Sequence, residues 1–145
     1  MKIEKVTEQN FPQAAAVYEA SWRESHQEIC SPEFLRQRDC AGYLRGRMAG
    51  LYLVSDPDPV GVFCLLDDKL SDLYIHPEHQ GRRYGRGCVE FAQARSSTLW
   101  LTVLSNNKKA IRLYEKMGFR FTGRDVPLPD GLWEREMRYS EKDNG

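Results

Sequence analysis

The residues best suited to chemistry form one run, Gln80-Gly81-Arg82-Arg83-Tyr84-Gly85-Arg86-Gly87. Three arginines and three glycines lie within these eight positions. A helix that begins here would present free backbone N–H donors and about half a positive charge at its first turn. Glycines would let a ligand approach the backbone closely. The run therefore predicts an anion site suited to a pyrophosphate. A solvated basic turn that is rich in glycine is the alternative interpretation.

The same run fails two common phosphate-binding templates. It lacks the Gly-Lys-Ser/Thr of a P-loop, which disfavours ATP or GTP with magnesium. It also lacks the Gly-x-Gly-x-x-Gly spacing of a dinucleotide-binding fold. A different phosphate-bearing carrier remains as the expected ligand.

The elements around this run predict a strand, loop, helix and strand in that order. Residues 70–76 suit a strand that Pro77 terminates, residues 84–95 carry apolar side chains at helical spacing, and residues 98–104 are rich in strand-forming types. Such a crossover makes its two strands parallel. Ligands commonly bind at the carboxyl ends of parallel strands, so this position favours the anion site over the basic turn.

The chain before residue 50 predicts one strand followed by two helices. Residues 2–6 alternate in polarity as a strand does, and residues 11–22 are apolar at helical spacing. Ser31-Pro32-Glu33 combines an N-cap serine with a proline and an acid in the first turn. The second helix is therefore expected to begin there and to end near Gly42 to Gly46.

The remaining segments complete a mixed sheet. Residues 51–66 predict a hairpin, Asn106-Asn107 predicts the cap of a final helix that stops at Gly118, and residues 119–122 and 132–139 predict two closing strands. The expected class is α/β (α+β), with a central sheet of about six to seven strands and about four helices. The sheet should be antiparallel in its N-terminal half and parallel where residues 70–76 pair with residues 98–104.

Length and composition favour one domain over residues 1–145 and exclude several classes of protein. Lys plus Arg and Asp plus Glu both number 21, so no overall field attracts nucleic acid or an acidic membrane. The start lacks the apolar region of a signal peptide, and no later apolar run approaches the ~20 residues of a membrane span, so a cytoplasmic protein is expected. The cysteines are expected to be reduced and no metal is expected, because there is no CxxC pair and there are only three histidines. The cysteines are Cys30, Cys40, Cys64 and Cys88.

Two motifs resemble those of the GNAT N-acetyltransferase superfamily. Residues 77–85, Pro-Glu-His-Gln-Gly-Arg-Arg-Tyr-Gly, resemble its acetyl-CoA loop, written Q/R-x-x-G-x-G/A. Residues 107–119 resemble its second signature, an asparagine followed by A-I-x-L-Y-x-x-x-G-F. The resemblance covers about residues 70–123 and implies the GNAT fold and the use of acetyl-CoA. One departure is Arg83, which stands where the family pattern has glycine.

The resemblance implies a set of residues that bind the coenzyme. The backbone of one strand would pair with the pantetheine arm, and the loop would hold the pyrophosphate. The residues implied are Leu73, Tyr74, Ile75, Gln80, Gly81, Arg82, Arg83, Tyr84, Gly85, Arg86, Gly87, Asn107 and Tyr114. Tyr114 would also protonate the departing thiolate as general acid. An aromatic core residue is the alternative for Tyr114, and a simple N-cap is the alternative for Asn107.

The general base and the acceptor site follow less directly. Thr102 stands where some relatives have a glutamate and cannot serve as a base. Asp72, on the strand that leads into the site, is the catalytic candidate, either directly or through water; a solvent-facing strand acid is the alternative. The candidates for binding the acceptor are Trp22, His26 and Glu28, with Tyr52 and Trp133 as further candidates. Packing is the alternative for both tryptophans.

The resulting expectation is an N-acetyltransferase that moves the acetyl group of acetyl-CoA to a primary amine of a small molecule or protein. The alternative is a non-catalytic acetyl-CoA or CoA-binding sensor or interaction module. Neither nucleic acid nor a membrane is an expected partner, and a monomer or a homodimer is expected. The sequence does not identify the amine, because specificity resides in the segments that least resemble the family.

Overall fold

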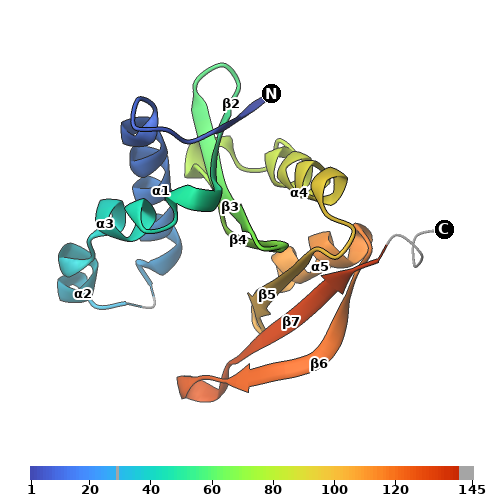
Figure 1. Cartoon of the computed structure of the whole chain (residues 1–145). Coiled ribbons are helices and arrows are strands. Elements are labelled where there is room, and N and C mark those ends of the chain that lie inside the picture. Colours follow the sequence, from blue (N-terminus) through green and yellow to red (C-terminus); the bar gives the residue numbers. More distant parts are fainter. Residues whose placement is uncertain (29, 141–145) are drawn as a thin grey trace. The chain divides into compact units, whose positions relative to one another are not determined.

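The computed structural model describes residues 1–28 and 30–140 (Figure 1). The chain forms two compact units. The N-terminal unit consists of Met1–Leu66 and Asp72–Cys88, and the C-terminal unit consists of Asp67–Ser71 and the chain from Val89 onward. None of the helices in the described part of the chain combines the length and the apolar character that a membrane crossing requires.

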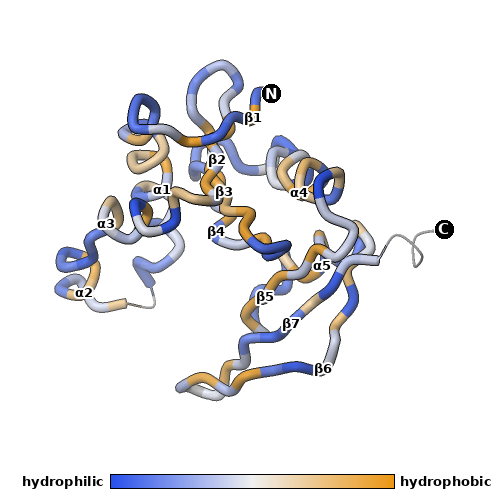
Figure 2. The backbone as a smooth tube through the Cα atoms, viewed as in Figure 1, coloured by the Kyte–Doolittle hydropathy of each residue, from blue (hydrophilic) through white to orange (hydrophobic). Residues whose placement is uncertain are grey.

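Three antiparallel strands form the sheet of the N-terminal unit: β1 (Lys2–Lys5), β2 (Leu51–Ser55) and β3 (Pro59–Leu66). Leu53 pairs with Val62 across β2 and β3, and both side chains are buried. Hydrophobic residues follow these two strands in Figure 2. The first strand and the hairpin predicted from the sequence are confirmed.

Helix α1 (Phe11–His26) packs against β3 and buries one face. Its buried residues are Phe11, Ala14, Val17, Tyr18, Ser21 and Trp22. Most of these lie three or four positions apart, the spacing of one helical face. The predicted helix over residues 11–22 is confirmed and extends to His26.

The predicted second helix is two helices, α2 (Pro32–Gln37) and α3 (Cys40–Arg45). Ser31 caps α2 as expected, by accepting a hydrogen bond from the Phe34 N–H at 3.1 Å. Arg38 is extended, with ψ 119°, and ends α2. Asp39 then caps α3 through the Gly42 N–H at 2.9 Å. The prediction of one continuous helix to residues 42–46 was wrong, because an aspartate cap begins a new helix after Arg38.

Strand β4 (Lys69–Ile75) belongs to both units and changes unit at Asp72. The turn before it has φ 51° at Asp67 and φ 66° at Asp68, and two such residues fit the type I′ turn favoured by strand twist. Asp72 itself has φ 54° within the strand. Aspartate is one of the few residues other than glycine that adopt this conformation readily. The short 3₁₀ helix η2 (Pro77–His79) follows the strand.

The C-terminal unit holds the rest of the sheet. Its elements are β5 (Trp100–Leu104), α5 (Lys108–Lys116), β6 (Phe119–Pro127) and β7 (Trp133–Tyr139), and α4 (Tyr84–Arg95) runs into it from the N-terminal unit. Strand β7 is antiparallel to both β5 and β6, whereas Lys69 of β4 pairs with Trp100 of β5 in parallel. The strand order is β1-β2-β3-β4-β5-β7-β6. The predicted mixed sheet with one parallel pair is confirmed.

Asp68 fixes the start of that parallel pair. Its carboxylate accepts hydrogen bonds from the Ser96 hydroxyl at 2.7 Å and the Thr98 hydroxyl at 3.1 Å. Its backbone carbonyl accepts from the Trp100 N–H at 2.9 Å. The turn before β4 is thereby tied to the segment that leads from α4 into β5.

Candidate active site

Residues 80–87 contain the end of the loop that joins β4 to α4 and the first turn of α4, as the sequence predicts. Gly81 has φ 82° and Arg83 has φ 67°, so the chain turns sharply twice before the helix begins at Tyr84. The Gly87 N–H closes the first helical turn on the Arg83 carbonyl at 3.1 Å, and the N–H groups of Tyr84 and Gly85 precede this first bond of the helix. A Cβ placed on Gly81 would meet nothing within 4 Å. The segment thus combines open space beside Gly81 with the N-terminal turn of a helix, a combination that suits a phosphate group.

Two side chains hold this loop in place. The Gln80 amide donates to the Ile75 carbonyl at 3.1 Å, and the Tyr84 hydroxyl donates to the Asp56 carboxylate at 2.7 Å. The hydrogen bond to Asp56 raises the pKa of Tyr84, and the same bond lowers the pKa of Asp56. Arg82 and Arg86 are exposed. Gln80 and Tyr84 therefore shape the loop, while the arginines face solvent.

Asp72 is paired, and the alternative of a solvent-facing strand acid was wrong. Its carboxylate accepts a hydrogen bond from the Tyr43 hydroxyl at 2.8 Å and pairs with the Arg47 Nε at 3.0 Å. Only 12% of the Asp72 side chain is exposed. Partial burial, reinforced by the hydrogen bond to Asp72, raises the pKa of Tyr43 to about 12. Tyr43 therefore remains a neutral donor to the carboxylate at physiological pH.

Three tyrosines pack together beside Asp72. The ring of Tyr18 stacks on Tyr43 with centroids 5.7 Å apart and meets the edge of Tyr74 at 5.3 Å. Burial raises the pKa of both Tyr18 and Tyr74. The sequence reading gave Tyr74 only a backbone role, whereas its side chain joins this cluster.

The predicted acceptor residues separate into two groups. Trp22 is 5% exposed and stacks on His26 with ring centroids 4.3 Å apart. The His26 Nδ1 lies 2.7 Å from the Trp22 carbonyl oxygen, so this imidazole closes the end of its own helix. Glu28 is exposed in the turn after α1 and makes no side-chain hydrogen bond or ion pair within residues 1–28 and 30–140. The structure brings Trp22 and His26 together, and Glu28 makes no hydrogen bond or ion pair with either of them.

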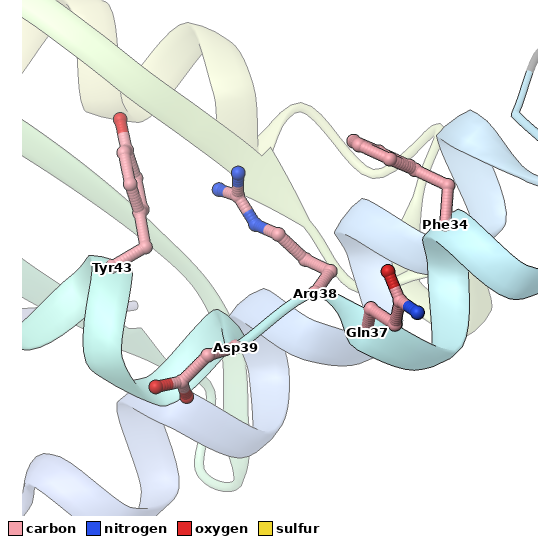
Figure 3. Close-up of a pocket in the computed structure, with 5 residues that line it drawn as sticks. All are labelled: Phe34, Gln37, Arg38, Asp39 and Tyr43. Carbon is pink, nitrogen blue, oxygen red and sulfur yellow. The ribbon is translucent and has the colours of Figure 1, made fainter.

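A cavity of about 360 Å³ lies next to these residues, between α2 and α3. Its lining residues are Phe34, Gln37, Arg38, Asp39 and Tyr43. Figure 3 shows the Arg38 guanidinium between the side chains of Phe34 and Tyr43, with Asp39 turned away. The sequence reading missed this cavity. The signal that could have revealed it is Asp39, a helix-capping residue in the middle of a predicted helix.

In the C-terminal unit, Asn107 caps α5 by accepting a hydrogen bond from the Ala110 N–H at 3.3 Å. Tyr114 is half-buried on this helix, with its ring 5.7 Å from that of Phe119. The cap is confirmed, and the chemical role of Tyr114 stays a prediction.

Thr102 has an acidic neighbour that the sequence did not reveal. It pairs across β5 and β7 with Glu136, which is 8% exposed. The Glu136 carboxylate accepts a hydrogen bond from the Thr122 hydroxyl at 2.7 Å. This buried acid is part of the β6–β7 packing.

The expectations about metals and thiols have different outcomes. Possible ligand atoms of His76, Glu78 and His79 lie within 4.8 Å of one another, so the expectation that no metal is used stays a prediction.

All four cysteines are free, and burial raises the pKa of Cys88 to about 12. Cys88 is therefore a core residue, as the sequence indicated.

Residues 11–119 match the family model described as the Acetyltransferase (GNAT) family. The chain belongs to this GNAT acetyltransferase family. The matched segment includes parts of both compact units and both motifs identified in the sequence.

Two curated relatives share part of the chain. The peptidyl-lysine N-acetyltransferase YjaB of Salmonella typhimurium is 38% identical over 72 residues, which cover 49% of this chain and 50% of the relative. The streptothricin acetyltransferase of Streptomyces lavendulae is 37% identical over 67 residues, which cover 43% of this chain and 35% of the relative. The chain thus spans about half the length of the first of these relatives, and less of the second.

Solved structures share the GNAT fold over nearly the whole chain. Apo YjaB from Escherichia coli has a TM-score of 0.70 at 22% identity and covers 95% of this chain and 96% of its own. The PaiA N-acetyltransferase from Thermoplasma acidophilum, solved with coenzyme A, has a TM-score of 0.65 at 17% identity and covers 95% of this chain and 98% of its own.

The GNAT pattern also explains the departure at Arg83. The backbone at this position has φ 67°, a conformation that costs a side-chain-bearing residue about 1–2 kcal/mol and costs glycine almost nothing. The family glycine therefore suits the turn itself. This chain keeps the turn with an exposed arginine.

Proposed function

We propose that this protein is an acetyl-CoA-dependent N-acetyltransferase that acts on a primary amine of a small molecule or a protein. The observation that carries the proposal is the segment of residues 80–87, which has open space beside Gly81 and leads into the first turn of α4 in a chain of the GNAT family. Both sequence motifs support the same assignment. The relatives named peptidyl-lysine N-acetyltransferases make a lysine side chain one candidate acceptor.

Within this proposal, groups of the protein bind acetyl-CoA and orient it. The N–H groups at the start of α4 hold the pyrophosphate, with Arg82 and Arg86 adding positive charge. The backbone of residues 73–75 aligns the pantetheine arm, and the Asn107 side chain adds a hydrogen bond to it. Bound acetyl-CoA supplies an activated thioester as the acetyl donor.

Two proton movements complete the proposed roles. Asp72 takes the proton that the amine must lose, directly or through a water, while Tyr43 and Arg47 hold its carboxylate in place. The Tyr114 hydroxyl gives a proton to the sulfur of the leaving thiolate. The net result is an acetamide and a free thiol.

We further propose that both compact units together make one acetyltransferase domain over residues 1–145. The family model supports this, because its match runs through both units. A cytoplasmic location, the absence of nucleic acid and membrane partners, and a monomeric or homodimeric state stay predictions.

The test is to incubate the protein with acetyl-CoA and a panel of amines and to measure the thiol released, with calorimetry of acetyl-CoA in parallel. We expect micromolar to millimolar KM values for at least one amine, the ordinary range for enzymes. Tight acetyl-CoA binding with no thiol release from any amine would favour the non-catalytic binding module instead. No binding of acetyl-CoA would contradict both.

A further inference from the structure

We infer that the acceptor carries a carboxylate near its reactive amine and that Arg38 is the residue that selects for this carboxylate. The inference rests on the proposed function, because it names the class of acceptor for that site. Two observations carry it. One is the cavity between α2 and α3, and the other is Arg38 within it, which has aromatic neighbours and no counter-ion among the described residues.

Arg38 is held rigidly by aromatic neighbours. Its guanidinium carbon lies 4.5 Å from the Tyr43 ring centroid and 4.8 Å from that of Trp22. One terminal nitrogen donates to the Tyr18 hydroxyl at 3.0 Å. A planar guanidinium fixed between rings loses little further freedom when it binds a ligand, so it is preorganised to receive one.

The charge of Arg38 lacks a counter-ion. Within the described residues Arg38 takes part in no ion pair, and its Nε is buried without a hydrogen-bond partner. Three other arginines of the N-terminal unit do pair with acids: Arg23 with Glu19, Arg45 with Glu8 and Arg47 with Asp72. The adjacent acid, Asp39, is committed to capping α3. A half-buried guanidinium in this state is suited to an anion from outside the chain.

Tyr43 links this arginine to the candidate base. Its ring contacts Arg38, and its hydroxyl donates to the Asp72 carboxylate. One tyrosine side chain therefore stands between a protein cation and a protein anion. An acceptor whose carboxylate pairs with Arg38 can direct its amine toward Asp72, which also pairs with Arg47, whereas a polyamine would bring a second cation against Arg38.

The residues that line the cavity favour a carboxylate over a larger anion as the bound group. A single guanidinium supplies the positive charge, and its planar fork fits a carboxylate with two parallel hydrogen bonds. Phe34 and Gln37 provide one apolar and one amide surface for a short connecting chain.

The first test compares acceptors that differ only in the carboxylate. Free lysine, lysinamide and 1,5-diaminopentane are acetylated under identical conditions, together with two peptides in which the lysine is followed by Glu or by Gln. We expect kcat/KM to be about 10- to 100-fold higher for lysine than for lysinamide if a free amino acid is the source of the carboxylate. The same preference for the Glu peptide would identify a protein source.

The second test uses matched variants. Arg38→Gln should raise KM for the carboxylate-bearing acceptor about 10- to 100-fold and abolish the preference, whereas Arg38→Lys should keep part of it. Arg36→Gln removes the same charge from an exposed position two residues earlier, in α2, and should change nothing. Calorimetry of acetyl-CoA and a melting curve for each variant show whether the coenzyme site and the fold persist.

The outcomes separate this inference from the proposed function. Equal use of lysine, lysinamide and the diamine together with equal use of the Glu and Gln peptides, or an Arg38→Gln enzyme with unchanged preference, would overturn the role of Arg38 and leave the acetyltransferase intact. If no amine is acetylated, calorimetric titration of free lysine into the wild type and the Arg38→Gln protein still tests the carboxylate site. Such a site requires that Arg38→Gln binds lysine more weakly than the wild type and that Arg36→Gln binds it equally well.

Discussion

Two arginine-rich regions of the N-terminal unit differ in how they are built. In the loop of residues 80–87, Arg82, Arg83 and Arg86 are exposed, and the binding groups that we propose are backbone N–H donors. In the segment of residues 32–47, Arg38 and Arg47 are half-buried, and contacts from distant elements fix each guanidinium. Backbone-based binding leaves a readable pattern of glycines and charges in the sequence. Side-chain-based binding depends on partners that only folding brings together.

The largest expected effect tests whether the chemistry is separate from both binding regions. Tyr114→Phe keeps the ring and removes the proton that we assign to the thiolate. Loss of general acid catalysis typically costs 10²–10⁴-fold, so kcat should fall by about that factor while acetyl-CoA affinity changes little. Steady-state kinetics with calorimetry measures both. Equal losses in rate and affinity would mark Tyr114 as a packing residue, and an unchanged rate would leave water as the proton source.

The second largest effect tests the loop of residues 80–87, where we propose binding by backbone groups. Gly85→Glu adds a side chain and a negative charge where we place the pyrophosphate, and acetyl-CoA binding should weaken by about 100-fold, on the order of 3 kcal/mol. Gly85→Ala adds only a methyl group and should weaken binding less. Calorimetry with acetyl-CoA is the measurement. Identical affinity in wild type and Gly85→Glu would place the coenzyme elsewhere.

A smaller effect tests the segment of residues 32–47, where side-chain contacts fix the arginines. Tyr43→Phe removes the hydroxyl that donates to the Asp72 carboxylate, and hydrogen bonds to charged groups contribute about 1.5–3 kcal/mol. Because Tyr43 is 38% exposed, we expect a value below this range, about 1 kcal/mol in the free energy of unfolding by urea. The Tyr139 hydroxyl makes no hydrogen bond within the described part of the chain, so Tyr139→Phe is the control. A loss of acetyl-CoA affinity in Tyr43→Phe would contradict our expectation that the segment of residues 32–47 does not contribute to coenzyme binding.

The smallest effect is a dependence of stability on alkaline pH. The pKa of Tyr43 is raised from 10.0 to about 12 in the folded protein. The folded state therefore holds this proton more tightly than the unfolded state. The stabilisation is fully present below pH 10 and is lost as the pH rises toward 12. After solvent screening we expect ~1 kcal/mol or less. Urea unfolding at pH 9 and pH 11 should show a smaller decrease for Tyr43→Phe than for the wild type. Equal decreases would contradict the assignment to Tyr43.

The sequence by itself determined the features that depend on neighbouring residues. The start of α4 after the loop, the Asn107 cap of α5 and the left-handed glycine at residue 118 all follow from local backbone preferences. The two motifs indicated the family because each is a set of particular residues at fixed spacing within one segment, and the family match includes both.

Tertiary structure alone decided the surroundings of Asp72 and Arg38. The Tyr43 hydroxyl reaches Asp72 across 29 positions in the chain, and Arg38 reaches the Tyr18 hydroxyl across 20. The extended Arg38 between two short helices turns its guanidinium toward α1 instead of continuing a helical face. No local propensity specifies such contacts, because they join residues far apart in the chain and form only when α1, α3 and β4 pack together.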